Sequence, residues 1–180
     1  MGQIKKTDFI AKRVTRSYTQ TINAEPAMAH SLICPVREAE WLDYWDCSLI
    51  YSQSGFAEKG CVFVSRDSSG EETIWLMTGR DDDDFVTEFV RVTPDSRVAT
   101  LSTAVEAAKG GRSFVRIVYT FTALNEKGNA SIDSFTEESF VADMKFWEAT
   151  VNHYLETGKS LPNPNSENWL GARPALDDGN

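Results

Sequence analysis

The chain has 180 residues, of which 41% are hydrophobic and 25% are charged, a balance that is ordinary for one globular domain. Its 27 acidic and 18 basic residues give a formal net charge of −9, which would repel a phosphate backbone, so we expect no nucleic-acid partner. No apolar run approaches the roughly 20 residues of a membrane-spanning helix, and residues 1–7 lack the apolar stretch of a secretory signal, so we expect no stable membrane insertion and a cytoplasmic location.

The first third of the chain predicts one strand and two short helices. Residues 9–22 are rich in Val, Thr, Tyr and Ile, and small hydroxyl residues alternate with larger ones, as in a half-exposed strand. Pro26 suits a first helical turn, and Pro35 disfavours helix at the residue before it. We therefore expect helices at 27–33 and 35–45.

From Cys47 onward the hydrophobic period changes to two. Six runs with this period are separated by turn residues such as Gly, Asp, Pro and Ser, and these loops are too short for helical crossovers. The pattern predicts an antiparallel meander. Its strands are expected at 47–52, 60–66, 73–80, 85–92, 98–105 and 113–124.

A long amphipathic helix is predicted near the end of the chain. It begins near Ser134–Thr136, where a hydroxyl cap precedes Glu137 and Glu138, and it ends at Gly158. Its apolar stripe consists of Phe140, Met144, Trp147, Val151, Tyr154 and Leu155. We expect a single domain over residues 1–158, followed by a partly ordered C-terminal extension over 159–180, which has three prolines.

This order of elements resembles the helix-grip superfamily, also called SRPBCC or START-like, which includes START lipid-transfer domains, birch-pollen-type allergens and aromatic polyketide cyclases. The run from Cys34 to Trp45, the run from Ile50 to Phe63, Thr73-Ile74-Trp75, the run from Tyr119 to Leu124, and Phe146-Trp147 look like a bacterial branch of that group. The resemblance covers about residues 9–158. It implies an α+β helix-grip fold, in which six or seven antiparallel strands curve around the C-terminal helix and leave a cavity for a lipid, sterol or aromatic compound.

The residues that would line such a cavity are apolar and mostly aromatic. On the last strand, one face carries alternate residues that should point inward, and the helical stripe and neighbouring strands should face them. The ligand-binding candidates are Trp75, Met77, Phe89, Val115, Ile117, Tyr119, Phe121, Met144, Trp147 and Val151. The alternative is that these side chains fill a solid core, because protein interiors are closely packed. Tyr51 and Tyr119 could offer hydroxyls to a ligand, or they could bond to protein or water.

Candidate catalytic groups are the carboxylates of the short helices. Glu38 and Glu40 stand close to Trp41 and Trp45, and an acid packed against indole can have a raised pKa and act as a general acid. The alternative is that Arg37 pairs with one of them and the helix only fastens to the sheet.

We expect no metal and no cofactor. Cys34, Cys47 and Cys61 form no Cys-x-x-Cys unit, which favours free thiols in a reducing compartment. The spacing of His30 and Cys34 matches no metal pattern, and the four consecutive acids from Asp81 cannot all face one ion, which favours a hairpin tip.

Three functional hypotheses follow. The first is a carrier or sensor that encloses a small hydrophobic or aromatic molecule in a cavity of several hundred cubic ångströms, the size usual for ligand sites. The second is a cyclase, dehydratase or hydrolase that uses Glu38 or Glu40 as its acid. The third is a noncatalytic interaction domain with an exposed apolar patch. For the whole chain, we expect a monomer or a homodimer.

Overall fold

A computed structural model describes residues 8–67 and 70–161, and in it seven antiparallel strands form one sheet. The strands are β1 (Arg13–Ile22), β2 (Asp46–Tyr51), β3 (Val62–Arg66), β4 (Glu72–Asp81), β5 (Val86–Thr93), β6 (Arg97–Ala108) and β7 (Arg112–Ala123). Their spatial order is β1-β7-β6-β5-β4-β3-β2, so the six strands of the meander are neighbours and β1 closes the far edge beside β7.

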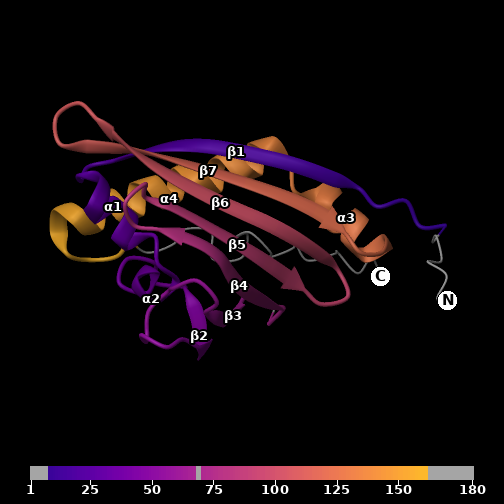
Figure 1. Cartoon of the computed structure of the whole chain (residues 1–180). Helices are drawn as coiled ribbons and strands as arrows, with labels where there is room; N and C mark the ends of the chain where they lie inside the picture. Colours follow the sequence, from indigo (N-terminus) through magenta and orange to yellow (C-terminus); the bar gives the residue numbers. More distant parts are fainter. Residues whose placement is uncertain (1–7, 68–69, 162–180) are drawn as a thin grey trace.

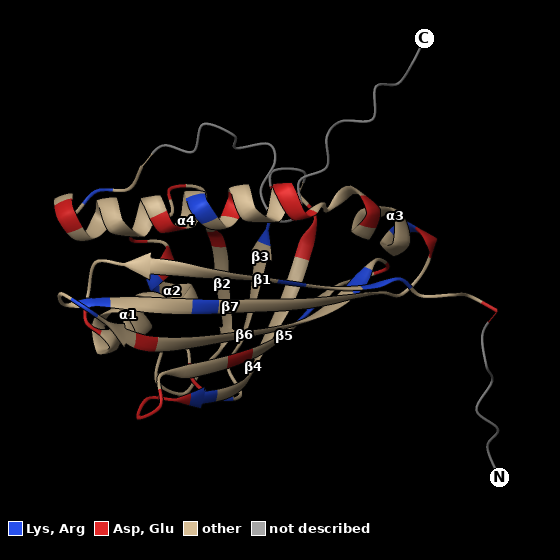
Figure 2. Cartoon of the chain, turned by 90° about the horizontal axis from the view of Figure 1, so that it is seen from above, with Lys and Arg blue, Asp and Glu red and all other residues tan. Residues whose placement is uncertain are grey.

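Four helices accompany the sheet: α1 (Pro26–Leu32), α2 (Pro35–Glu38), α3 (Glu126–Ser134) and α4 (Glu137–Thr157). The long helix α4 lies along one face of the curved sheet (Figure 1). The view turned by 90° shows α4 as a separate layer beside the strands (Figure 2). The predicted fold class is confirmed: an antiparallel seven-stranded sheet, a long C-terminal helix, and two short helices after the first strand.

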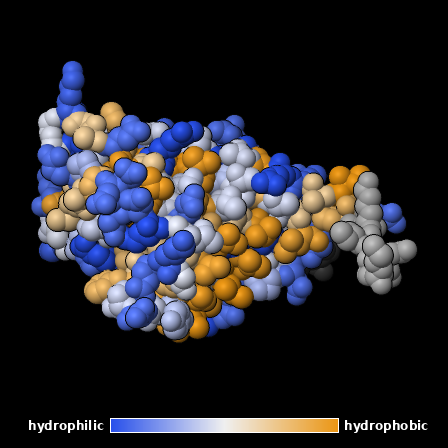
Figure 3. All heavy atoms as spheres, viewed as in Figure 1, coloured by the Kyte–Doolittle hydropathy of each residue, from blue (hydrophilic) through white to orange (hydrophobic). Residues whose placement is uncertain are grey.

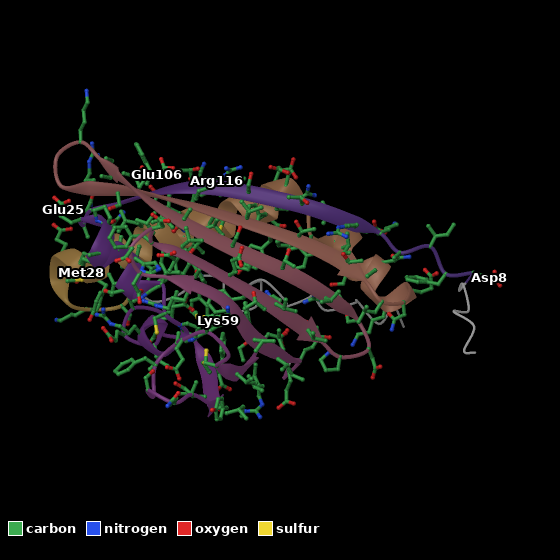
Figure 4. All side chains as sticks on the ribbon, in the orientation of Figure 1. Asp8, Glu25, Met28, Lys59, Glu106 and Arg116 are labelled. Carbon is green, nitrogen blue, oxygen red and sulfur yellow. The ribbon has the colours of Figure 1, made fainter. Side chains whose placement is uncertain are left out.

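The alternation of buried and exposed residues along each strand determines which side chains face α4. On β4, Trp75 and Met77 are buried whereas Ile74 and Leu76 are exposed. The same alternation along β7 buries every second residue from Val115 to Phe121, while Arg116 lies on the outer face (Figure 4). The interior of the protein is therefore the space between the inward rows of the sheet and α4.

Helix α4 has the ends that the sequence predicts. The Thr136 side chain accepts a hydrogen bond from the amide of Ser139, and Gly158 adopts a left-handed conformation with φ of 70°. The predicted stripe faces the sheet: its first four residues are buried, and Tyr154 and Leu155 are half-buried.

Two helix predictions are wrong. The second short helix ends at Glu38 rather than at residue 45, because the chain turns there to bring two tryptophans to backbone acceptors. Trp41 Nε1 donates to the Leu32 carbonyl at 3.1 Å, and Trp45 Nε1 donates to the Pro35 carbonyl at 2.7 Å. Such tertiary hydrogen bonds override a local helical pattern.

Helix α3 was missed because Asn125, Gly128 and Asn129 are poor helix formers. In the structure the Asn125 side chain caps this helix by accepting from the Gly128 amide, and Gly128 lies against the β5–β6 turn. A Cβ atom at position 128 would stand 2.0 Å from the carbonyl oxygen of Ser96, so only glycine allows this close approach.

The expected C-terminal extension begins at residue 159, and only its first three residues lie within the described part of the chain. Leu161 forms a parallel bridge with Leu42, and residues 162–180 of the predicted extension lie outside the described residues. Within residues 8–67 and 70–161, no helix combines the length and the apolar character that crossing a bilayer requires.

Candidate functional site

A small cavity lies between the sheet, the short helix α2 and the long helix α4. Strands β3 to β7 supply most of its wall, α2 and the adjoining turns close one side, and α4 closes another. Its lining residues are Ile33, Pro35, Glu38, Trp45, Phe63, Trp75, Phe89, Leu101, Thr103, Ile117, Tyr119 and Trp147. The wall is apolar and aromatic except at Glu38, Thr103 and Tyr119.

The cavity has a volume of about 20 Å³, which is room for about one water molecule. This is far below the several hundred cubic ångströms that the first hypothesis expected. Aromatic packing is the reason: Phe63 stacks on Trp75 with ring centroids 5.3 Å apart, and Phe89 meets the Trp75 ring edge-on at 6.2 Å. In this conformation the expected interior is largely filled by its own side chains.

All ten predicted lining residues are buried, but they fall into two groups. Five line the cavity: Trp75, Phe89, Ile117, Tyr119 and Trp147. The other five, Met77, Val115, Phe121, Met144 and Val151, belong to the surrounding core. Tyr51, considered as a hydroxyl donor, is 62% exposed on β2 and lies outside the cavity wall.

The sequence interpretation missed several lining residues. Phe63 and Leu101 occupy inward positions of β3 and β6, so the period of two could have identified both. Pro35 is the first residue of the four-residue helix α2, and Ile33 and Trp45 lie in the segments before and after it, where no periodic pattern indicates direction. Their place in the wall depends on how the short helices dock, which only the fold reveals.

Glu38, the first acid candidate, faces this cavity. It is the last residue of α2 and is only 5% exposed. Among the described residues no side chain forms a hydrogen bond or ion pair with its carboxyl group, and burial raises its pKa from 4.5 to about 8. At neutral pH the group is therefore mostly protonated and can donate a hydrogen bond or a proton.

Glu40, the second acid candidate, lies on the surface. Its carboxylate accepts hydrogen bonds from Arg37 at 3.0 and 3.1 Å and from the Tyr154 hydroxyl at 2.8 Å. The hydrogen bonds from Arg37, chiefly, hold the pKa of Glu40 below its ordinary value. The neighbouring acid Asp43 is exposed, so Glu38 alone of these three carboxyl groups lines the cavity.

Two further polar side chains lie beside the cavity. Burial raises the pKa of Tyr119 to about 12, although the nearby Arg91 guanidinium opposes the shift. Arg91 is 4% exposed, and its guanidinium lies 4.6 Å from the centroid of the Trp75 ring. The sequence interpretation overlooked Arg91, although it stands at an inward position of β5, two residues after Phe89.

A second acid with a shifted pKa is Asp143 on α4. Burial raises its pKa from 3.8 to about 7, and its charge contributes to the raised pKa values of Tyr44 and Tyr119. Asp143 is not part of the cavity wall, so it acts on the cavity only through its charge.

The outer face of the sheet carries an apolar patch over β3, β4 and β5 (Figure 3). Ile74 and Leu76 are 43% and 41% exposed, and they stand beside half-buried valines on both neighbouring strands. The patch consists of Val62, Val64, Ile74, Leu76, Val90 and Val92. The third hypothesis requires a patch of this kind.

A shallow hollow of about 510 Å³ lies between β1 and the junction of α3 and α4. Four of its charged groups form two pairs: Lys12 contacts Asp133, and Arg16 contacts Glu137 at 3.2 Å. Among residues 8–67 and 70–161, no three His, Cys, Asp or Glu side chains are grouped so that they could hold a metal ion.

Neither a family model nor a curated protein matches the sequence. Among solved structures, norcoclaurine synthase from Thalictrum flavum is similar with a TM-score of 0.60 at 8% identity, over 87% of this chain and 99% of its own. The Zhui aromatase/cyclase from Streptomyces sp. R1128 gives 0.59 at 10% identity, over 83% of this chain and 100% of its own. Ara h 8.0201 gives 0.55 at 12% identity, over 81% and 99%. At such identities these likenesses concern the fold and not the chemistry.

Proposed function

Because this chain has the helix-grip fold of the SRPBCC, START-like superfamily, we propose that it binds a small hydrophobic or aromatic molecule, such as a lipid, a sterol or a polyketide-like compound, between its sheet and α4. The observation that carries the proposal is the buried carboxyl group of Glu38, which faces an aromatic cavity without a protein partner among the described residues. Ligand sites are typically apolar with a few well-placed polar groups.

A cavity of about 20 Å³ is too small for a lipid, a sterol or an aromatic compound, so binding requires the interior to widen. The wall at α2 is the part that can yield, because Ile33 and Trp45 are only half-buried and α2 has four residues. The wall made by β6 and β7 is held by hydrogen bonds along 12-residue strands. Binding therefore proceeds by displacement of side chains around α2.

The proposal is tested with two isoleucine variants. Ile117→Phe adds bulk inside the cavity, whereas Ile74→Phe adds the same bulk on the outer face of the sheet. The probe is 2-ethylnaphthalene, and its binding is followed by the fluorescence of the tryptophans that line the cavity. Circular dichroism shows whether each variant folds.

We expect the wild type and Ile74→Phe to bind the probe equally, and Ile117→Phe to bind at least tenfold more weakly. Equal binding by Ile117→Phe, or loss of binding in Ile74→Phe, would place the probe elsewhere. A wild type that does not bind the probe would contradict the proposal. Native mass spectrometry of freshly purified protein supplies an independent readout, since a co-purified small molecule identifies the ligand class.

The raised pKa of Glu38 favours a second candidate function, a cyclase- or dehydratase-like enzyme. A carboxyl group that keeps its proton at neutral pH, in a site that excludes water, can protonate a carbonyl or leaving-group oxygen. In that case Glu38→Gln retains binding and loses turnover. The outer apolar patch is what favours the third candidate, a noncatalytic interaction domain.

A further inference from the structure

Three polar side chains line the cavity, and two of them can donate hydrogen bonds into it. Glu38 is buried and unpaired among the described residues, and Tyr119 is 1% exposed and lines the same space. The third polar side chain, Thr103, is engaged elsewhere, because its hydroxyl lies 2.6 Å from that of Thr87. Two groups therefore determine what polar atom the cavity accepts.

Arg91 decides the direction of the Tyr119 hydroxyl. The charge of the nearby Arg91 guanidinium and a hydrogen bond from it both favour a lower pKa of Tyr119, and arginine can only donate. The phenol oxygen of Tyr119 is then the acceptor, and its own proton is left to point away from Arg91. Tyr119 lines the cavity whereas Arg91 does not, so that proton is available to the cavity.

Arg91 is also a buried cation without an anion. Among the described residues no carboxylate lies within 4.0 Å of its guanidinium, and its Nη1 atom has no hydrogen-bond partner. Stacking on Trp75 offsets part of the cost of burying this charge. Its positive charge nevertheless favours negative charge on any atom that Tyr119 contacts.

A protonated carboxyl group and a phenol thus face a space of about 20 Å³, the size of one oxygen-containing group, and the buried Arg91 cation lies behind the phenol. All are donors or positive charges, so an apolar or cationic group would leave them unsatisfied. A carbonyl oxygen has two lone pairs and can accept from two donors.

We propose that this cavity binds the carbonyl oxygen of a ketone- or aldehyde-bearing aromatic ligand, with Glu38 and Tyr119 as its two donors and Arg91 as the positioning residue that orients Tyr119. The inference rests on the proposed function, since it names the class of molecule that the interior takes. The apolar rings of Phe63, Trp75 and Phe89 then contact the aromatic part of the ligand.

The test compares two probes of nearly equal size, 2-acetylnaphthalene and 2-ethylnaphthalene, which differ in the carbonyl oxygen. Two hydrogen bonds of about 1 kcal/mol each correspond to a preference of about 30-fold for the ketone. We expect that preference in the wild type, and a fall to about fivefold in Tyr119→Phe, which keeps only the bond from Glu38. Tyr18→Phe is the matched control, because Tyr18 contacts Glu148 outside the cavity.

The infrared carbonyl band of bound 2-acetylnaphthalene tests the role of Arg91 directly. Hydrogen bonding lowers the frequency of this band, so we expect a higher frequency in Tyr119→Phe and in Arg91→Met, and a wild-type-like value in Arg91→Lys. Loss of packing alone would not move the band. If Arg91→Met does not fold, the Tyr119→Phe measurement still decides the inference.

The failures of the two proposals are distinguishable. Equal affinity of the wild type for both probes overturns the carbonyl site and leaves the binding of apolar molecules standing. An unshifted band in Tyr119→Phe also overturns it. Failure of the wild type to bind either probe overturns both proposals.

Discussion

Two sides of the molecule build the same cavity in different ways. The scaffold side, which we define as β6, β7 and α4, has strands of 12 residues and a helix of 21, and it buries Ile117, Tyr119 and Trp147 deeply. The access side, which we define as α1, α2 and β2, has a helix of four residues and an edge strand of six with a register shift between Leu49 and Tyr51.

This difference between the two sides indicates where the interior can open. Strands β6 and β7 have neighbours on both sides, so moving either breaks two ladders of hydrogen bonds. Strand β2 is bonded on one side only, and the four-residue helix α2 is held by side-chain hydrogen bonds such as that from Trp45 Nε1 to the Pro35 carbonyl. Local opening is drawn from regions of low stability, which here means the access side.

The largest expected effect is a loss of stability on the scaffold side. Phe140→Ala removes a ring that is fully buried and packs edge-on against Tyr119 at 6.3 Å, so we expect a loss of about 3–5 kcal/mol in the free energy of unfolding. Phe56→Ala, at a ring that is 57% exposed, should change it by about 0.5 kcal/mol or less. Urea unfolding measures both. Equal losses would contradict the close packing of Phe140 on the scaffold side.

The next effect concerns Glu38, which the access side holds inside the cavity. Its pKa is about 8 in the folded state and 4.5 ordinarily, so the unfolded chain releases the proton first as pH rises. Stability should therefore fall from pH 4.5 to 8, by about 5 kcal/mol, and level off above pH 8.

In Glu38→Gln most of this fall should disappear, because the amide does not titrate. A smaller fall should remain from Asp143, whose pKa is raised to about 7, and Asp143→Asn should remove that part. Urea midpoints at pH 5 and pH 8 provide the measurement. The same fall in Glu38→Gln as in the wild type would show that Glu38 is ionised in the folded protein.

A smaller effect, on the local stability of the access side, is expected at Trp45. Trp45→Phe removes the hydrogen bond to the Pro35 carbonyl, so we expect a loss of about 1 kcal/mol in local stability. Hydrogen exchange should become faster in residues 33–51 and remain unchanged in β7. If the amides of the access side and of β7 exchange with equal free energies in the wild type, the distinction between the two sides is refuted.

The smallest effect on stability is expected at the outer apolar patch. Ile74→Thr with Leu76→Thr should alter the free energy of unfolding by about 0.5 kcal/mol or less and leave probe binding unchanged. Light scattering over a range of concentrations reports the molar mass. A dimer that these changes convert to a monomer supports the interaction-domain hypothesis, and a mass that they do not alter argues against it.

The sequence predicted the scaffold side better than the access side, and the reason is periodicity. The inward row of β7 and the stripe of α4 repeat often enough for spacing to predict burial, which is how Ile117 and Trp147 were found. Residues 39–45 have no repeat, and their path depends on where Trp41 and Trp45 find acceptors. No local sequence pattern predicts where these hydrogen-bond acceptors lie.

The acid candidates show the same limit. Glu38 and Glu40 are two residues apart and look equivalent in the sequence, yet one is buried in the cavity wall and the other pairs with Arg37 at the surface. The end of α2 at Glu38 separates them. Arg91 was missed because an arginine at an inward strand position contradicts the usual expectation that charged residues are exposed.

The free edge of β2 has a practical consequence for handling the protein. Leu49, Ile50 and Tyr51 are 38%, 64% and 62% exposed on a strand whose outer hydrogen-bonding groups face no neighbouring strand of the sheet. Such an edge is a template for strands from other copies, so prolonged storage at high concentration favours cross-β aggregation that starts there. A lysine in place of Ile50 would guard this edge without touching the cavity wall.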